Sequence, residues 1–294
     1  MLTELPGQTE TSSPKRNRRD HYLPQSYLRG FIDPVRGNHQ RPLWYFDVPN
    51  DSWSERSPRE IGYRHGFYDY ASSEAGVGTA DDSFAELERT YPNVLSGMIS
   101  NRFGNWKEHL SFLLRYIQMI RARSLLFFDQ MQIEGQNLRA WVIEEVSPDR
   151  KSVKVRSMTP EPLPPKFIRN WTITQMRTQI QQGATWLNDF NWALRYCESS
   201  VEPFVICEMP LMAWGKQHSD LAEMLRDAET LLFFPLCWQA CLVGSRQFFH
   251  EETRIFGQHD MQTARTMYRE KASLFIVSPR QLQFPKSVTT ATSK

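Results

Sequence analysis

The sequence predicts one α+β domain over residues 20–280, with a mainly antiparallel sheet and a cluster of helices. Segments with strand-like patterns come in runs, whereas helical periodicity is concentrated between residues 81 and 131. This segregation favours an α+β arrangement over alternating β-α-β units. The chain has 294 residues, of which 40% are hydrophobic and 23% charged, as expected for a globular protein with a sizeable core.

The two ends of the chain differ from this domain. Residues 1–19 are polar and rich in Ser, Thr, Pro and Arg, which predicts a mobile tail, and residues 281–294 predict a loose C-terminal tail. Basic residues cluster between Lys15 and Arg19. They either contact phosphate groups or only keep the tail solvated.

The first elements follow the N-terminal tail directly. The stretch DHYLPQSYLRGF, residues 20–31, predicts an extended start, then a short helix that begins at the proline and ends at Gly30. PLWYFDV, residues 42–48, has the aromatic and β-branched content of a strand. Residues 61–70 predict an extended, irregular segment, and the Gly-rich residues 71–80 a loop.

Two helices are predicted in the middle of the chain. Residues 81–100 carry apolar side chains at helical spacing, with Asp81 or Asp82 as N-cap and a kink or break at Pro92. Residues 105–131 have the strongest helical pattern of the chain.

Strand-like segments come in runs in the second half, with two helices between them. Alternating residues on both sides of the turn SPDR predict a hairpin, and residues 166–187 a helix. Short apolar segments predict strands or buried segments at 191–197, 202–209, 231–236 and 238–244. The sequence pattern then predicts a helix over residues 260–272 and a last strand over residues 273–277.

Charge and cysteine usage argue against several classes of protein. The net charge of +2 is low for a general nucleic-acid or membrane-surface binder, so an anionic partner needs a local patch. No apolar run is long enough to cross a bilayer, and the first residues have no secretory signal. We therefore expect a cytoplasmic protein without a membrane partner. The four cysteines predict reduced, buried thiols rather than a metal or redox site.

The common catalytic and nucleotide-binding signatures are missing. The sequence has no phosphate-cradling P-loop and no G-x-S-x-G elbow, and GVG at 76–78 does not continue as a dinucleotide fingerprint. HEETRIF lacks the second histidine of a zinc protease helix. The sequence therefore assigns no cofactor, no metal and no oligomeric state, and leaves open whether the protein is an enzyme.

One arginine interrupts the apolar stripe of the predicted helix at 105–131. The stripe consists of Leu110, Leu113, Leu114, Ile117, Ile120, Leu125 and Phe128. Arg121 falls within it, whereas Arg115 and Arg123 fall outside. A guanidinium on a core-facing stripe cannot lose its charge and needs partners. Arg121 either pairs with a carboxylate, extends its charge to solvent, or lines a cleft and binds an anionic ligand.

Polar side chains in the opening stretch suggest a second part of a site. Gln25 and Arg29 are four residues apart and share a helix face. His21 precedes the helix, near N–H groups that attract anions, and its pKa suits general acid–base chemistry. These three residues form either a polar pocket wall or a packing and capping knot that ties the N-terminus to the sheet.

Two further polar residues are candidates. Tyr68 is either a ligand clamp or a hydroxyl that satisfies buried neighbours. Glu208 lies in an apolar run, where burial would raise its pKa and make it an acid–base group. The alternative for Glu208 is a strand end that faces water.

The opening stretch and the strand after it resemble the start of a bacterial family grouped as domain of unknown function 4238. Those proteins begin with His-Tyr-Val-Pro-Gln, followed by Arg-x-Phe and a strand that ends in Tyr-Asp. This chain matches the motif at His21, Tyr22, Pro24, Gln25, Arg29 and Phe31. The similarity covers most of residues 20–280 and is most specific at this motif.

Later segments carry weaker resemblance. RYIQMIRARS resembles the family's arginine-bearing helix, which places Arg121 or Arg123 in that role. FVICEMPLM resembles its Thr-Ser-Asp-Asn-Pro-Val segment but retains only Pro210, with Glu208 at the Asp-like position. The resemblance implies a polar site of the hydrolase or nuclease type, used in conflict with phages, and the loss of Ser-Asp-Asn argues against retained activity.

Two functions are therefore open. The first is a hydrolase-like site for a phosphate-bearing substrate, such as nucleic acid, in the cytoplasm. In it His21 and Glu208 are the acid–base pair, Arg29 and Arg121 hold the anion, and Gln25 orients the substrate. The second is a non-catalytic ligand-binding or regulatory module, in which the same residues are scaffold or ligand contacts.

Overall fold

The computed structural model describes most of the domain that the sequence predicts. The described residues are 19–33, 35, 40, 42–70, 84–138, 141–146, 153–157, 163–182, 185–197, 203–215 and 225–284. Several predictions fall outside these residues, namely the tail up to residue 18, the loop at 71–80, the caps Asp81 and Asp82, the turn at 147–150 and the tail from residue 285.

The larger sheet has five strands. In spatial order they are β12 (Thr253–Ile255), β7 (Asn191–Tyr196), β11 (Ala240–Ser245), β10 (Leu231–Cys237) and β9 (Met212–Trp214). All neighbours are antiparallel except β12 and β7, which are parallel. β9 lies at one edge of this sheet, and its strand partner is β10.

A second sheet joins the two ends of the domain. Its four antiparallel strands are, in order, β3 (Ser52–Arg56), β2 (Leu43–Asp47), β13 (Phe275–Ser278) and β8 (Ile206–Cys207). Two further antiparallel pairs are β1 (Arg19–His21) with β4 (Tyr63–His65), and β5 (Trp141–Val146) with β6 (Val153–Ser157). The predicted α+β class with mainly antiparallel pairing is confirmed.

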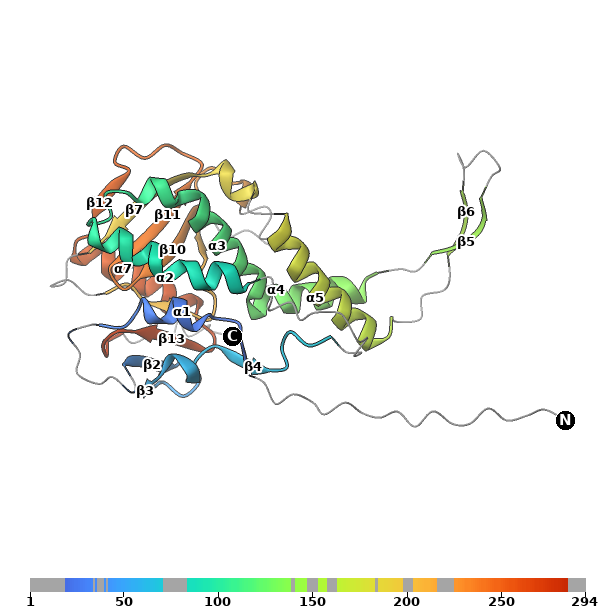
Figure 1. Ribbon diagram of the computed structural model, residues 1–294, viewed down its shortest axis with the longest axis horizontal. Helices are drawn as coiled ribbons and strands as arrows, with labels where there is room; N and C mark the ends of the chain where they lie inside the picture. The colour runs from blue at the N-terminus through green and yellow to red at the C-terminus, as the bar shows by residue number, and fades with distance from the viewer. Residues whose placement is uncertain are drawn as a thin grey trace, which may run out of the picture.

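Helices cover both faces of the five-stranded sheet (Figure 1). Within the described residues the helices are α1 (Gln25–Arg29), α2 (Ala85–Ser100), α3 (Leu110–Arg123), α4 (Leu125–Gln136), α5 (Pro165–Gln181) and α7 (Gln258–Lys271), with 3₁₀ helices η1 (Pro58–Glu60), η3 (Trp106–His109) and η4 (Thr185–Asp189). Leu232 and Phe234 of β10 pack with α2 and α3, whereas Phe233 between them packs with α7. This alternation is that of a strand buried on both faces.

The strongest predicted helix, residues 105–131, is divided by Ser124. Its backbone there is extended (φ −65°, ψ 152°), so α3 ends and α4 begins. The Ser124 hydroxyl accepts a hydrogen bond from the Phe127 amide at 3.2 Å and donates one to the Arg121 carbonyl at 2.7 Å. Ser124 is thus the N-cap of α4. The apolar periodicity hid this break because Leu125 continues the stripe of α3.

Gly30 ends α1 for a different reason from the one predicted. Its φ of −63° is right-handed, so no left-handed cap is formed. A Cβ atom at this position would lie 3.2 Å from both the Leu236 carbonyl oxygen and the Leu95 side chain. The Trp238 amide also donates to the Gly30 carbonyl at 3.1 Å. Glycine is therefore suited to this position by the close approach of α1 to the sheet and α2.

Two predictions on chemical class can be compared with the fold. In the part of the chain that the structure describes, no helix is both long and apolar enough to cross a membrane. All four cysteines are free and buried, as predicted. Burial raises the pKa of the Cys237 thiol to about 12, which makes it a poor nucleophile.

Candidate functional site

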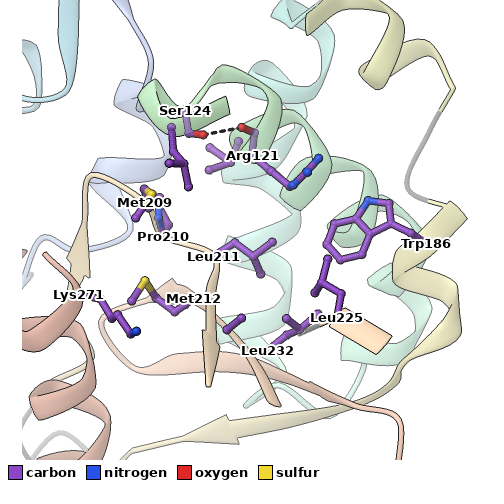
Figure 2. Close-up of a pocket in the computed structure, with 13 residues that line it drawn as sticks. Arg121, Ser124, Trp186, Met209, Pro210, Leu211, Met212, Leu225, Leu232 and Lys271 are labelled. Carbon is purple, nitrogen blue, oxygen red and sulfur yellow. Dashed lines mark hydrogen bonds between the residues drawn. The ribbon is translucent and has the colours of Figure 1, made fainter. Parts of the chain in front are cut away.

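A cavity of about 180 Å³ lies where α3, α4, η4, α7 and the segment 209–213 meet. Its lining is mostly apolar and includes two cationic side chains, Arg121 and Lys271. Figure 2 shows Arg121 and Trp186 on one side of the cavity, with Met212 and Lys271 on the other. A concave apolar space with a few polar groups is the usual form of a small-molecule site.

The guanidinium of Arg121 is the main polar group of this cavity. Its central carbon lies 5.4 Å from the ring centroids of both Phe127 and Trp186. No acidic side chain among the described residues forms an ion pair with it. Burial lowers the pKa of Arg121, which means that the charge is partly removed from water. Because arginine stays protonated, an anion bound here would offset that cost.

The aromatic partner Trp186 is fixed by a buried glutamine. The Trp186 indole N–H donates to Gln118 Oε1 at 2.9 Å. Gln118 is itself buried, and its amide donates to Gln179 Oε1 of α5 at 3.1 Å. Since Gln118 lies one helical turn before Arg121, the same face of α3 carries the cation and orients the ring beside it.

The opposite wall is held by Glu208. Its buried carboxylate accepts four hydrogen bonds, from Ser273 N (2.6 Å), Ser273 Oγ (2.7 Å), Leu274 N (3.2 Å) and Phe275 N (3.3 Å). Tyr268 of α7 donates to the Pro210 carbonyl at 2.9 Å. These bonds attach the segment that begins at Met209 to the end of α7 and the start of β13. Glu208 therefore positions a wall of the cavity without lining it.

Two of the predicted site residues meet around Arg123 rather than Arg121. The buried Arg123 donates to the Tyr68 hydroxyl at 2.8 Å and to the His21 carbonyl, and it pairs with Glu88. Tyr68 also donates to the His21 carbonyl at 3.1 Å. Burial raises the pKa of Tyr68 to about 12. This cluster ties β1, α2 and α3 together.

The His21 ring and the two predicted residues of α1 also lie apart from the cavity. The His21 ring is partly buried, its Nε2 is 3.4 Å from the Arg59 carbonyl oxygen, and burial lowers its pKa. Gln25 is half-buried and Arg29 exposed on α1. Of the six predicted site residues, only Arg121 lines the cavity. The catalytic roles assigned to His21 and Glu208 stay predictions.

Some residues of the site were missed from the sequence. Trp186 and Met209 gave no signal, because each reaches the cavity through the tertiary fold. Gln118 does carry a signal in the sequence. A glutamine one turn before Arg121 in a largely apolar helix needs a polar partner. Arg123 was placed outside the buried stripe, yet its side chain is fully buried.

Across the described ranges, no group of three or more His, Cys, Asp or Glu side chains could hold a metal ion.

Comparison with known proteins identifies one family. No curated protein and no solved structure matches the chain. A family model for proteins of unknown function, DUF4238, matches residues 19–279. The match begins at β1, next to the His-Tyr-Leu-Pro-Gln motif, and ends after β13. Because it spans nearly the whole described fold, this chain belongs to the DUF4238 family.

Proposed function

We propose that the protein is a non-catalytic binding module for a small organic anion with an apolar body. The observation that supports this most directly is Arg121, a partly desolvated guanidinium beside two aromatic rings in an apolar cavity, with no described carboxylate as partner. Structural arginines that leave water are normally paired, as Arg123 is. An arginine without such a partner suits an acceptor that arrives with the ligand.

Size and polarity narrow the ligand class. An apolar cavity of about 150 Å³ holds one benzene ring, so the space of about 180 Å³ suits one ring or one branched aliphatic chain. A carboxylate matches the planar guanidinium with two parallel hydrogen bonds. A phosphate dianion would carry more charge into apolar surroundings at a higher desolvation cost. A monoanionic carboxylate is therefore the better ligand.

The hydrolase-like alternative has less support. It depends on His21 and Glu208 as acid–base groups, and neither lines the cavity. The Glu208 carboxylate accepts four hydrogen bonds from residues 273–275, which leaves little capacity for proton transfer to a substrate. Activity on phosphate esters or nucleic acid, and a role in defence against phages, stay predictions from the sequence resemblance.

Calorimetric titration of the full chain with benzoate and 4-methylpentanoate tests the proposal. At least one acid should bind, and its neutral amide should bind about tenfold more weakly or worse, because the charge-assisted bonds are lost. Arg121→Met should weaken the acid by a similar factor. Arg115→Met removes an exposed arginine of the same helix and should leave binding unchanged.

Two results would overturn the proposal. The first is that neither benzoate nor 4-methylpentanoate binds to the wild-type chain. The other is equal acid binding by wild type and the Arg121→Met variant, since the anion would then lie elsewhere.

A further inference from the structure

We infer that the ligand of this cavity is the free C-terminus of a polypeptide with an apolar last residue, which adds as a short strand to the open edge of β9. The inference rests on the proposed function, because it places the terminal carboxylate at Arg121. It goes further by assigning the rest of the ligand to the sheet edge.

The cavity straddles the edge of the five-stranded sheet. Ala213 faces the side of the sheet covered by α3, and Met212 faces the side covered by α7, yet both line the same cavity. Arg121 of α3 and Lys271 of α7 also both line it, although these helices cover opposite faces of the sheet. Neighbouring side chains of one strand point to opposite faces. A single space reaches both by passing around the edge or the start of the strand, where Met209, Pro210 and Leu211 also line it.

Main-chain groups on the outer side of that edge have no partner among the residues that the structure describes. β9 pairs with β10 through Met212 with Phe233, Ala213 with Leu232, and Trp214 with Leu231. In an antiparallel pair, alternate residues direct their N–H and C=O groups away from the partner strand. Among the described residues, none forms a backbone hydrogen bond to this outer side of β9. An extended chain beside β9 would satisfy these groups.

A peptide terminus matches three features of the site. Its carboxylate fits the Arg121 guanidinium, its last side chain fits the apolar space, and its main chain fits the edge of β9. Leu211 and Trp186 would contact that side chain from two sides. A simple carboxylic acid uses only the first two features. We therefore expect the peptide to bind more tightly than an acid with the same side chain.

A pool of N-acetylated tetrapeptides that end in Leu, Ile, Val or Phe, with all residues at the other three positions, is the appropriate probe. The pool is selected on the immobilised full chain, and enriched peptides are titrated individually. The best free-acid peptide should bind about tenfold more tightly than 4-methylpentanoate, because it adds main-chain hydrogen bonds. The C-terminal amide of the same peptide should bind about tenfold more weakly. The free acid should lose a similar factor in affinity for the Arg121→Met variant.

The outcomes separate this inference from the proposed function. If 4-methylpentanoate binds but the pool yields no tighter peptide, the peptide inference is wrong and the small-anion function stands. If neither binds, both are wrong. N-methylation of each internal amide of the enriched peptide in turn should weaken it at one position or more. Unchanged affinity at all positions would exclude pairing with β9.

Discussion

Arg121 and Arg123 lie two residues apart on α3 and have opposite surroundings. Arg123 is fully buried, pairs with Glu88 and donates to Tyr68 and to the His21 carbonyl. Arg121 lines an apolar cavity beside the rings of Phe127 and Trp186 and forms no ion pair with a described carboxylate. Two residues correspond to a rotation of about 200° around a helix, so the two side chains leave α3 on opposite sides.

The charge of Arg123 stabilises the fold, whereas the charge of Arg121 is available to a ligand. A buried guanidinium costs free energy unless its donors are paired within the protein. Arg123 meets this condition, whereas Arg121 meets it only through ring faces, which are weaker partners than a carboxylate. The two arginines should therefore respond oppositely to removal of their charge.

Arg123→Met should have the largest effect on stability. The change leaves Glu88, Tyr68 and the His21 carbonyl without their shared donor, and we expect a loss of about 3 kcal/mol in the free energy of unfolding. Urea-induced unfolding followed by tryptophan fluorescence measures it. The exposed Arg115→Met is the matched control. A loss no larger than that of the control would show that the Arg123 cluster does not stabilise the fold.

Glu208→Gln should have the second largest effect on stability. It should also affect the Arg121 cavity. An amide presents N–H groups to the donors of residues 273–275, so we expect a loss of about 2 kcal/mol in stability. Because Glu208 holds the wall of the cavity, acid binding should also weaken, but less than with Arg121→Met. The exposed Glu251→Gln is the control in the same unfolding and titration measurements. Unchanged stability would assign Glu208 a role other than positioning.

Local sequence patterns predicted the elements well because their causes are local. The strand at Leu43–Asp47 follows from aromatic and β-branched content, and the helix at Gln258–Lys271 follows from helical spacing of apolar residues. The break at Ser124 was missed, since a serine within an apolar pattern looks like an ordinary helix residue until its capping bond is seen. A single apolar stripe also did not predict the burial of α3, because this helix is buried on most of its circumference.

The site could be predicted only in part for the same reason. Arg121 was detectable because a charge within an apolar stripe is a local anomaly. Its surroundings were not, because Trp186 and Met212 come from distant segments brought together by the sheet. The His-Tyr-Leu-Pro-Gln motif points to His21, but it is the His21 backbone carbonyl that joins the Arg123 cluster, while the ring lies beside the Arg59 carbonyl. Polar clustering in sequence thus marked a structural junction more clearly than a cavity.

Arg121→Met should shift stability by the smallest amount of the three charge changes, and in the opposite direction. Methionine fills a similar volume without a desolvated charge, so we expect a gain of up to about 1 kcal/mol in the absence of ligand. The measurement is the same urea unfolding, beside Arg115→Met. A loss as large as that of Arg123→Met would make Arg121 a structural ion-pair residue and would remove the contrast on which the proposed function depends.

The smallest expected effect is the pH dependence of stability that His21 contributes. It tests whether the charge of Arg123, unlike that of Arg121, acts on His21. Burial, and then the positive charge of Arg123, lower the His21 pKa below its usual value of about 6.5, although the Arg59 carbonyl opposes this shift. The unfolded chain therefore binds more protons just below about pH 6.5, and stability should fall as the pH is lowered through that range.

The ring is partly exposed, so this contribution should stay under about 1 kcal/mol. Urea unfolding at about pH 7.5 and about pH 5 measures it, with His21→Gln expected to reduce the pH-dependent loss and the exposed His250→Gln to leave it unchanged. Arg123→Met should also reduce the loss, because one source of the lowered pKa disappears. Arg121→Met should not, since its charge lies on the other side of α3. If both arginine variants changed the pH dependence equally, the two sides of the helix would not be electrostatically separate.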